Sequence, residues 1–164
     1  MKPAAWGTLR GVAARDPTAP GPGDRLGPFA LGEPLRVGAW SSQWAAEHDG
    51  GGRVRLELCH GDAPRRFVEA KRRLAARPPR GVAPVLSVEA LGPGPVAVSR
   101  PALGPALSDI RASRIAPEAG AVAALGRDLA RALAAVRSLG IAPPSLNARD
   151  VELGPGGAAR LDGF

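Results

Sequence analysis

The alternation of hydrophobic and polar residues predicts an antiparallel sheet in the first part of the chain. It is clearest over residues 54–59, where every second side chain is apolar, as is typical of a half-buried strand. The run Asp49-Gly-Gly-Gly52 just before it suits a tight hairpin turn. We expect five strands, over residues 29–37, 41–48, 54–59, 82–90 and 96–99.

Apolar residues at helical spacing predict two main helices. The first covers residues 63–77, and its apolar face consists of Phe67, Ala70 and Leu74. The second covers residues 117–139, and its apolar stripe consists of Val122, Leu125, Leu129, Leu133 and Val136. A shorter helix is expected over residues 107–112, and the glycine-rich run 154–157 turns a final hairpin. Strands followed by helices in this order predict an α+β fold.

Charge and composition narrow the class of protein. The net charge of +7 and pI of about 11.3 would suit an anionic partner, but no aromatic residues interleave with the basic ones, so we do not expect nucleic-acid binding. One cysteine excludes an internal disulfide. No apolar run approaches ~20 residues, so no membrane segment is expected and the cytoplasm is the default location.

Six short segments are informative through their order and spacing along the chain, although none is specific alone. They are Leu31-Gly-Glu-Pro-Leu35, Ala45-Ala-Glu-His-Asp49, Arg66-Phe67, Val82-Ala-Pro-Val85, Leu103-Gly-Pro-Ala-Leu-Ser-Asp109 and Leu139-Gly-Ile141. With the order of strands and helices, they resemble a protein kinase over residues 28–164, closest to bacterial Ser/Thr kinases of the transmembrane-receptor type. The resemblance implies a kinase-like fold: a five-stranded antiparallel N-lobe with one helix, and a partial helical C-lobe. The domains expected are a flexible Pro/Gly-rich leader (1–27), the N-lobe (28–99), a hinge-like linker (100–105) and the partial C-lobe (106–164).

The resemblance also implies residues that handle ATP, and most of these positions hold something else. A kinase has a lysine on the third strand that holds the phosphates and a glutamate on the first helix that pairs with it. The aligned positions hold Glu57, which would repel a triphosphate, and Ala70. In the catalytic loop the base position holds Ser145, too weak an acid–base group at neutral pH, and the lysine position holds Asn147.

The metal-binding positions are altered in the same way. Asp150 stands where a kinase has a metal-binding asparagine, and it could still bind a cation. Gly163 stands at the metal-binding aspartate, while Asp162 lies one residue earlier, so a shifted register would restore a ligand there. We expect no bound metal, and Asp150 and Asp162 are the candidates if there is one.

The pocket that would hold adenine carries polar residues where kinases have apolar ones. Gly38 remains at one glycine position of the phosphate-covering loop, and Gln43, Arg55 and Glu152 replace residues above and below the base. We hypothesise that Arg55 and Glu152 meet across the cleft as an ion pair. The alternative is that both point to solvent from a loosened cleft.

These replacements together imply a catalytically inactive kinase-like domain, a pseudokinase, that acts as a protein-binding or scaffold module in signalling. We expect no enzymatic activity, no cofactor, and a protein partner that binds the exposed stripe of the long helix or the first-helix face at Arg66, Lys71 and Arg73. Two alternatives stay open. One is an atypical Ser/Thr kinase-like enzyme that binds Mg-ATP with Asp150 and Asp162, and the other is a truncated remnant without function.

Overall fold

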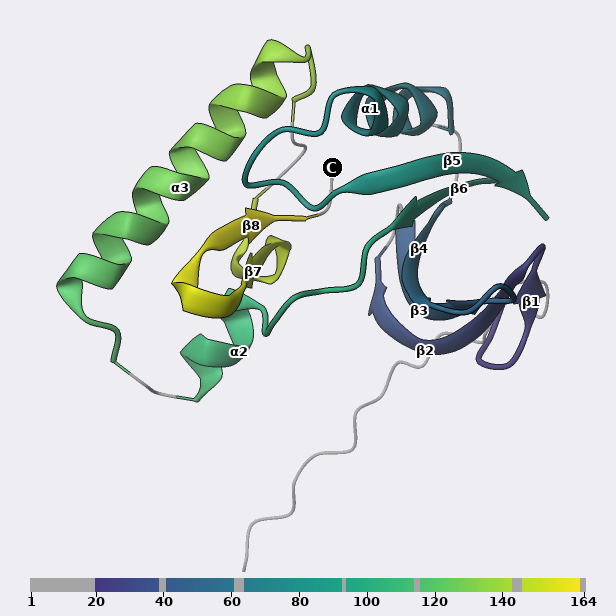
Figure 1. Ribbon diagram of the computed structural model, residues 1–164, viewed down its shortest axis with the longest axis horizontal. Helices are drawn as coiled ribbons and strands as arrows, with labels where there is room; N and C mark the ends of the chain where they lie inside the picture. The colour runs from purple at the N-terminus through teal and green to yellow at the C-terminus, as the bar shows by residue number, and fades with distance from the viewer. Residues whose placement is uncertain are drawn as a thin grey trace, which may run out of the picture.

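A computed structural model describes residues 20–38, 41–60, 64–92, 94–113, 116–142 and 146–162 of the chain. Its first part is a curled antiparallel sheet of six strands in the order β1-β2-β3-β4-β6-β5 (Figure 1). The strands are β1 (Arg25–Leu26), β2 (Phe29–Val37), β3 (Ser41–His48), β4 (Arg53–Cys59), β5 (Val85–Leu91) and β6 (Gly94–Ser99).

Helices and a small hairpin complete the fold. Helix α1 (Pro64–Ala76) lies against β5, and α3 (Ala119–Ser138) lies on the far side of the β7–β8 hairpin from the sheet (Figure 1). The remaining elements are α2 (Leu107–Ala112), the 3-10 turns η1 (Ala148–Asp150) and η2 (Pro155–Gly157), and the hairpin strands β7 (Val151–Leu153) and β8 (Ala159–Leu161). This mixed fold, in which a curled antiparallel sheet with one helix precedes α2, α3 and the hairpin, agrees with the α+β class that the sequence predicts.

The sheet begins earlier than the sequence predicts. Arg25 pairs with Ala30 and Leu26 with Phe29, so β1 adds a sixth strand inside the segment expected to be a flexible leader. Leu26 is buried there because it joins the hydrophobic core inside the curled sheet. The segment expected to be a flexible leader, residues 1–27, therefore extends too far at its C-terminal end. Residues 1–19 lie outside the described residues.

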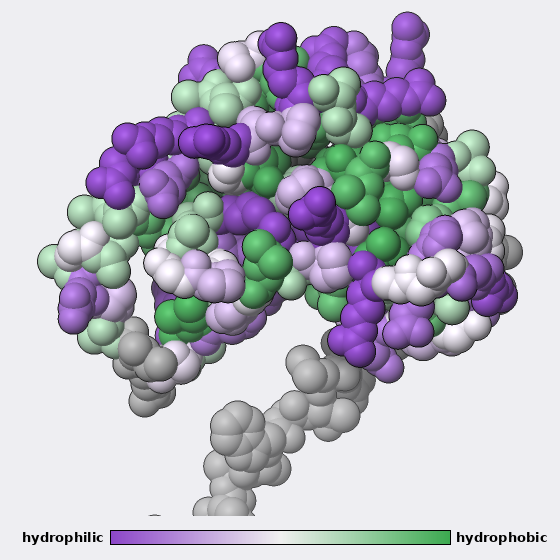
Figure 2. Space-filling model, in the orientation of Figure 1, coloured by the Kyte–Doolittle hydropathy of each residue, from purple (hydrophilic) through white to green (hydrophobic). Residues whose placement is uncertain are grey.

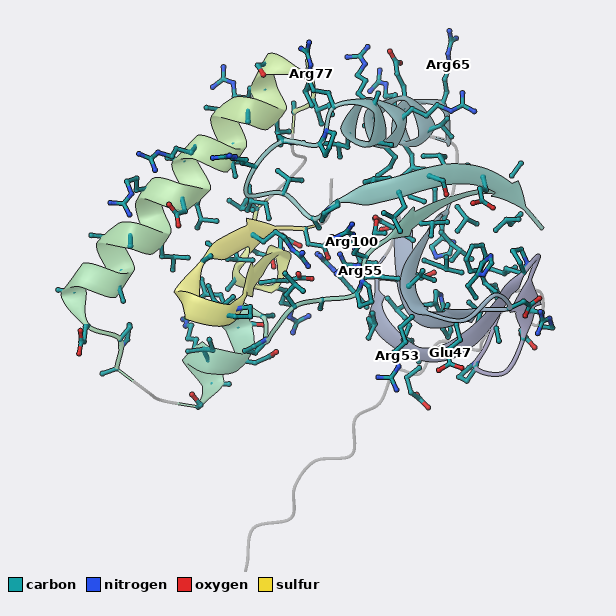
Figure 3. All side chains as sticks on the ribbon, viewed as in Figure 1. Glu47, Arg53, Arg55, Arg65, Arg77 and Arg100 are labelled. Carbon is teal, nitrogen blue, oxygen red and sulfur yellow. The ribbon has the colours of Figure 1, made fainter. Side chains whose placement is uncertain are left out.

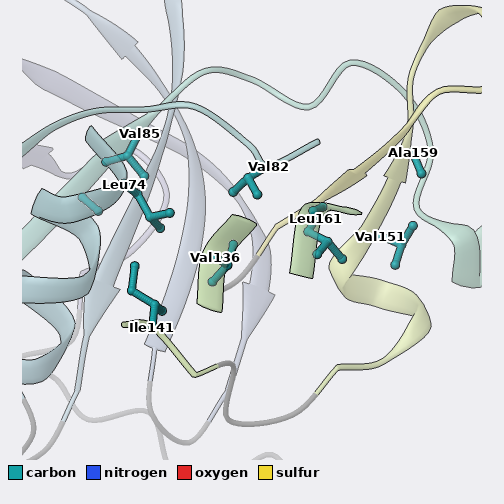
Figure 4. Packing of buried hydrophobic residues seen from close by; sticks show 10 residues of the cluster. Leu74, Val82, Val85, Val136, Ile141, Val151, Ala159 and Leu161 are labelled. Carbon is teal, nitrogen blue, oxygen red and sulfur yellow. The ribbon is translucent and has the colours of Figure 1, made fainter. Parts of the chain in front are cut away.

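A second hydrophobic core joins the sheet's helix to the later elements. Leu74 of α1, Val136 of α3 and Leu161 of β8 are each almost fully buried in it (Figure 4). The main chain extends the connection, because Ala83 N–H donates to Leu161 O at 2.7 Å and Leu161 N–H donates to Gly81 O at 2.7 Å. The hairpin is thus held against residues 81–83, the segment that leads into β5.

Helix α3 is covered more than the sequence suggests. Ala132 and Val136 are buried, and the leucines of its stripe pack against the second core. Val122, near its start, is the residue of the stripe that is half exposed. The expectation that this stripe forms an exposed binding surface is therefore wrong, because its leucines pack against the second core and α3 lies against β8. No helix among the described residues is long and apolar enough to cross a membrane.

The close approach of α3 to the turn at Gly81 gives a testable prediction. Gly81 has φ +76°, and a Cβ there would lie 3.0 Å from the Cβ of Ala132. Gly51 has φ +84° but no atom within 4 Å of such a Cβ. Alanine at either position should cost about 1–2 kcal/mol in backbone strain, and Gly81→Ala should cost more because α3 must move. Urea denaturation of both variants measures this, and equal losses would contradict the tight packing of α3.

Candidate functional site

The site to which the sequence points is a cleft between the sheet and the β7–β8 hairpin. It has a volume of about 570 Å³. Gln43 and Arg55 line it from the sheet, and Glu152 and Asp162 line it from the hairpin, so three of the four predicted pocket residues come together here. The fourth, Gly38, is exposed at the end of β2, where its N–H donates to Ser41 O at 2.9 Å.

Arg55 is the central residue of this cleft. Its side chain is only 5% exposed, and its Nη1 lies 2.5 Å from Glu152 Oε1 and 2.7 Å from Asp162 Oδ2 (Figure 3). Arg160 Nη2 holds the other oxygen of Glu152 at 2.6 Å. Among the described residues, Arg55 Nη2 is buried without a hydrogen-bond partner. The predicted contact between Arg55 and Glu152 is confirmed, and Asp162 is an additional partner.

The alternation of side chains along the hairpin strands determines which residues face the cleft. Val151 pairs with Leu161 in the β7–β8 ladder, and both side chains are buried in the second core. Since neighbouring side chains on a strand point to opposite faces, Glu152 and Arg160 lie together on the other face, toward the cleft. The apolar residues of the hairpin therefore fix the position of its charged ones.

The surroundings of Asp162 in the cleft shift the pKa of its carboxyl group. Burial raises the pKa of its carboxyl, and the guanidinium of Arg55 opposes that rise. The side chain remains 13% exposed and in contact with Arg55. A buried carboxylate of this kind depends on its cation, so Arg55 and Asp162 are expected to act as a unit.

A second buried ion pair lies deeper, between β4 and α1. Lys71 Nζ lies 2.5 Å from Glu57 Oε2, and the two side chains are 3% and 8% exposed. Ser41 Oγ donates to the other oxygen of Glu57 at 3.0 Å. The ring of Phe67 lies 5.6 Å from the ammonium group. We call Glu57–Lys71 the charge-reversed pair, because the strand supplies the acid and the helix supplies the base.

This pair corrects two sequence expectations. The helix position opposite Glu57 is Lys71, whereas Ala70 packs against the second core. Lys71 is also buried, so it is not part of an exposed first-helix face. The sequence held a signal for this, because Lys71 follows Phe67 by four residues and precedes Leu74 by three, which puts it on the apolar face of the helix.

Asp150 has a structural role in the last segment of the chain. Its buried carboxylate accepts hydrogen bonds from Arg36 and from the N–H of Asn147, the latter at 2.9 Å. Asn147 Oδ1 in turn accepts from Arg149 N–H at 3.0 Å, so the two side chains cap η1. The two remaining catalytic-loop and metal positions, Ser145 and Gly163, lie outside the described residues.

The residues of the cleft do not fit a bound Mg-ATP. Both carboxylates that could hold a metal are already in contact with guanidinium groups, Asp150 with Arg36 and Asp162 with Arg55. In the described part of the chain, no three His, Cys, Asp or Glu residues are grouped as a metal site. The position that would hold the phosphates carries the buried acid of the charge-reversed pair.

Comparison with known proteins gives the class of fold. The chain has a protein kinase-like fold. The crystal structure of a point mutant of the Mycobacterium tuberculosis PknI kinase domain superposes with a TM-score of 0.73 at 19% sequence identity over 89% of this chain. The match covers 62% of that kinase domain, so this chain spans about three fifths of its length. No protein-family model and no curated protein matches the sequence.

Proposed function

We propose that this chain is a kinase-like domain that does not transfer phosphate, and that it serves as a protein-binding or scaffold module in signalling. The observation that carries the proposal is the buried cluster of Arg55 with Glu152 and Asp162 in the cleft. In the kinases that the fold resembles, that cleft would receive the nucleotide base. Here it is crossed by ion pairs of the protein itself.

The charges across the cleft are complementary. Arg36 and Arg55 on the sheet side meet Asp150, Glu152 and Asp162 on the hairpin side. These contacts join the two parts of the domain without a ligand, and each would have to open before a nucleotide could enter. Buried pairs of this kind favour one arrangement more than they add stability. We infer that the domain keeps a closed conformation in the absence of nucleotide.

The chemistry of phosphoryl transfer supports the same proposal. Transfer depends on cations and metal ions that hold the phosphates in position, and there is little covalent work for the protein to do. Glu57 supplies a negative charge at the position of the phosphate-binding lysine, and Lys71 neutralises that charge. Among the described residues, the nearest cation to Glu57 is thus already paired, which supports a role for the domain other than phosphoryl transfer.

A thermal melt with and without millimolar Mg-ATP tests the proposal. A nucleotide present at 100 times its Kd would stabilise the fold by about 2.7 kcal/mol, a shift of several degrees for a domain of this size. We expect one cooperative transition that Mg-ATP does not move. A clear upward shift that Asp150→Asn or Asp162→Asn abolishes would instead support the atypical ATP-binding enzyme. Failure to melt cooperatively would favour the non-functional remnant.

A further inference from the structure

The positive charge of this protein is concentrated in one segment. Residues 64–80 carry seven basic residues and one acidic residue, a net +6 out of +7 for the whole chain. Lys71 is buried with Glu57, so the surface charge belongs to six exposed arginines: Arg65, Arg66, Arg72, Arg73, Arg77 and Arg80. Figure 2 shows hydrophilic side chains gathered along the edge that α1 forms, and Figure 3 shows Arg65 and Arg77 extending from it.

A groove lies beside these arginines, between α1 and β5. Its volume is about 860 Å³, and we call it the basic groove. Val68, Val88 and Pro95 are among the apolar residues that line it, and Arg65 and Arg72 lie at its helix side. In the described part of the chain, the side chains of these two arginines form no hydrogen bond or ion pair. They are free to bind an acidic group from outside.

The two acids in the basic groove already have partners. Glu69 forms an ion pair with Arg73, and Glu89 accepts a hydrogen bond from Ser87 Oγ at 2.7 Å. These two carboxylates would repel an unbroken line of phosphates, and none of the described residues that line the groove is aromatic and able to stack on a base. The groove therefore suits a ligand whose negative charges are spaced apart by apolar groups.

We propose that the basic groove docks an acidic segment of a partner protein, in which Asp or Glu residues flank aliphatic side chains. The inference rests on the proposed function as a binding module, and it names the surface and the chemistry of the partner. This chain does not supply the segment itself. Outside residues 64–80 it has 15 basic and 14 acidic residues, and its first 19 residues are basic, with Lys2, Arg10 and Arg15 against Asp16.

The spacing of the arginines predicts the spacing of the acids. Arg65 and Arg72 are seven residues apart on α1, which brings them to the same face of the helix about 10 Å apart along its axis. A peptide in the polyproline II conformation advances about 3.1 Å per residue with three residues per turn, so two acids three positions apart lie on the same side of it, about 9 Å apart. We expect Asp/Glu-x-x-Asp/Glu, with an aliphatic residue between the acids. Each guanidinium can bind a carboxylate through two parallel hydrogen bonds.

An unbiased peptide selection tests this inference. The full chain would be used to select binders from a library of random twelve-residue peptides, and the selected sequences would be read. We expect enrichment of acids three positions apart around an aliphatic residue. The double variant Arg65→Glu/Arg72→Glu should weaken binding of the selected peptides by at least about tenfold. The matched control Arg131→Glu/Arg137→Glu reverses two exposed arginines of α3 and should leave binding unchanged.

The outcomes separate this inference from the proposed function. Selected peptides without acidic enrichment would overturn the proposal that the basic groove docks an acidic segment, and so would peptides whose binding both double variants weaken equally. The Mg-ATP melt would still test the proposed function. Tighter, Arg65- and Arg72-dependent binding of duplex RNA or of vesicles containing phosphatidylserine would also overturn it. Thermal melts of both double variants verify folding, which substitution of exposed arginines should leave intact.

Discussion

Arg55→Met should lower the free energy of unfolding by about 3–5 kcal/mol at pH 7.5, because it leaves a buried acid without its cation. Glu152 keeps Arg160 as a partner, so the loss falls mainly on Asp162. Methionine retains much of the length of the arginine side chain, which limits the contribution of an empty space. Denaturation in urea at fixed pH measures the change.

The same variant should show a pH dependence of known sign. Burial raises the pKa of Asp162, so the folded protein holds this proton more tightly than the unfolded chain does. Its contribution to stability is then full below the ordinary value of 3.8 and is lost as pH rises through the raised pKa. Without the guanidinium of Arg55, the pKa of Asp162 rises further. The loss of stability with rising pH therefore continues to a higher pH in Arg55→Met than in the unaltered protein. The deficit of Arg55→Met should therefore be smaller at pH 4.5 than at pH 7.5.

Two further variants show whether the cluster is the cause. Arg53→Met changes an exposed arginine of the same strand and should cost no more than about 0.5 kcal/mol. Adding Asp162→Asn to Arg55→Met removes the stranded charge and should recover part of the stability, as contacting residues do in a double-mutant cycle. A deficit that is independent of pH and unaffected by Asp162→Asn would show that Arg55 acts through packing alone.

Local pattern was enough to predict most of the elements. The predicted strand at residues 41–48 and the predicted short helix at residues 107–112 coincide with β3 and α2, and the turn that begins at Asp49 defines where the strand ends. The two-residue strand β1 has no periodicity that could reveal it. It exists because Leu26 reaches the core inside the curled sheet, which is a tertiary effect.

The part of the candidate site that could be predicted is the one where the resemblance to a protein kinase places two residues on opposite sides of the cleft. Opposite charges at Arg55 and Glu152 predicted their contact, and the structure confirms it. The involvement of Asp162 depends on the register of the hairpin, which short strands do not reveal. The charge-reversed pair does not follow from the resemblance, because counting from Phe67 places Ala70 opposite Glu57, whereas the helix presents Lys71 there.

Lys71→Met should destabilise the fold by about 3–5 kcal/mol, since it leaves Glu57 buried with, among the described residues, the hydroxyl of Ser41 as its remaining donor. The matched control is Glu69→Gln, which breaks an exposed pair with Arg73 on the same helix and should cost about 0.5 kcal/mol or less. Urea denaturation of both variants gives the comparison. A loss for Lys71→Met as small as that of the control would mean that the charge-reversed pair contributes little to the fold.

The exchange Glu57→Lys/Lys71→Glu tests whether the stability of the fold requires only two opposite charges at these positions, or specifically the acid on the strand and the lysine on the helix. It keeps both side chains in the same interior space and should recover most of the stability that Lys71→Met loses. It also restores the lysine on the strand and the glutamate on the helix that the kinase-like fold implies. We still expect no thermal shift with Mg-ATP, because Arg55 remains in the cleft with Glu152 and Asp162. A shift in the exchanged variant alone would mean that Glu57, and not the Arg55 cluster, is what keeps the nucleotide out.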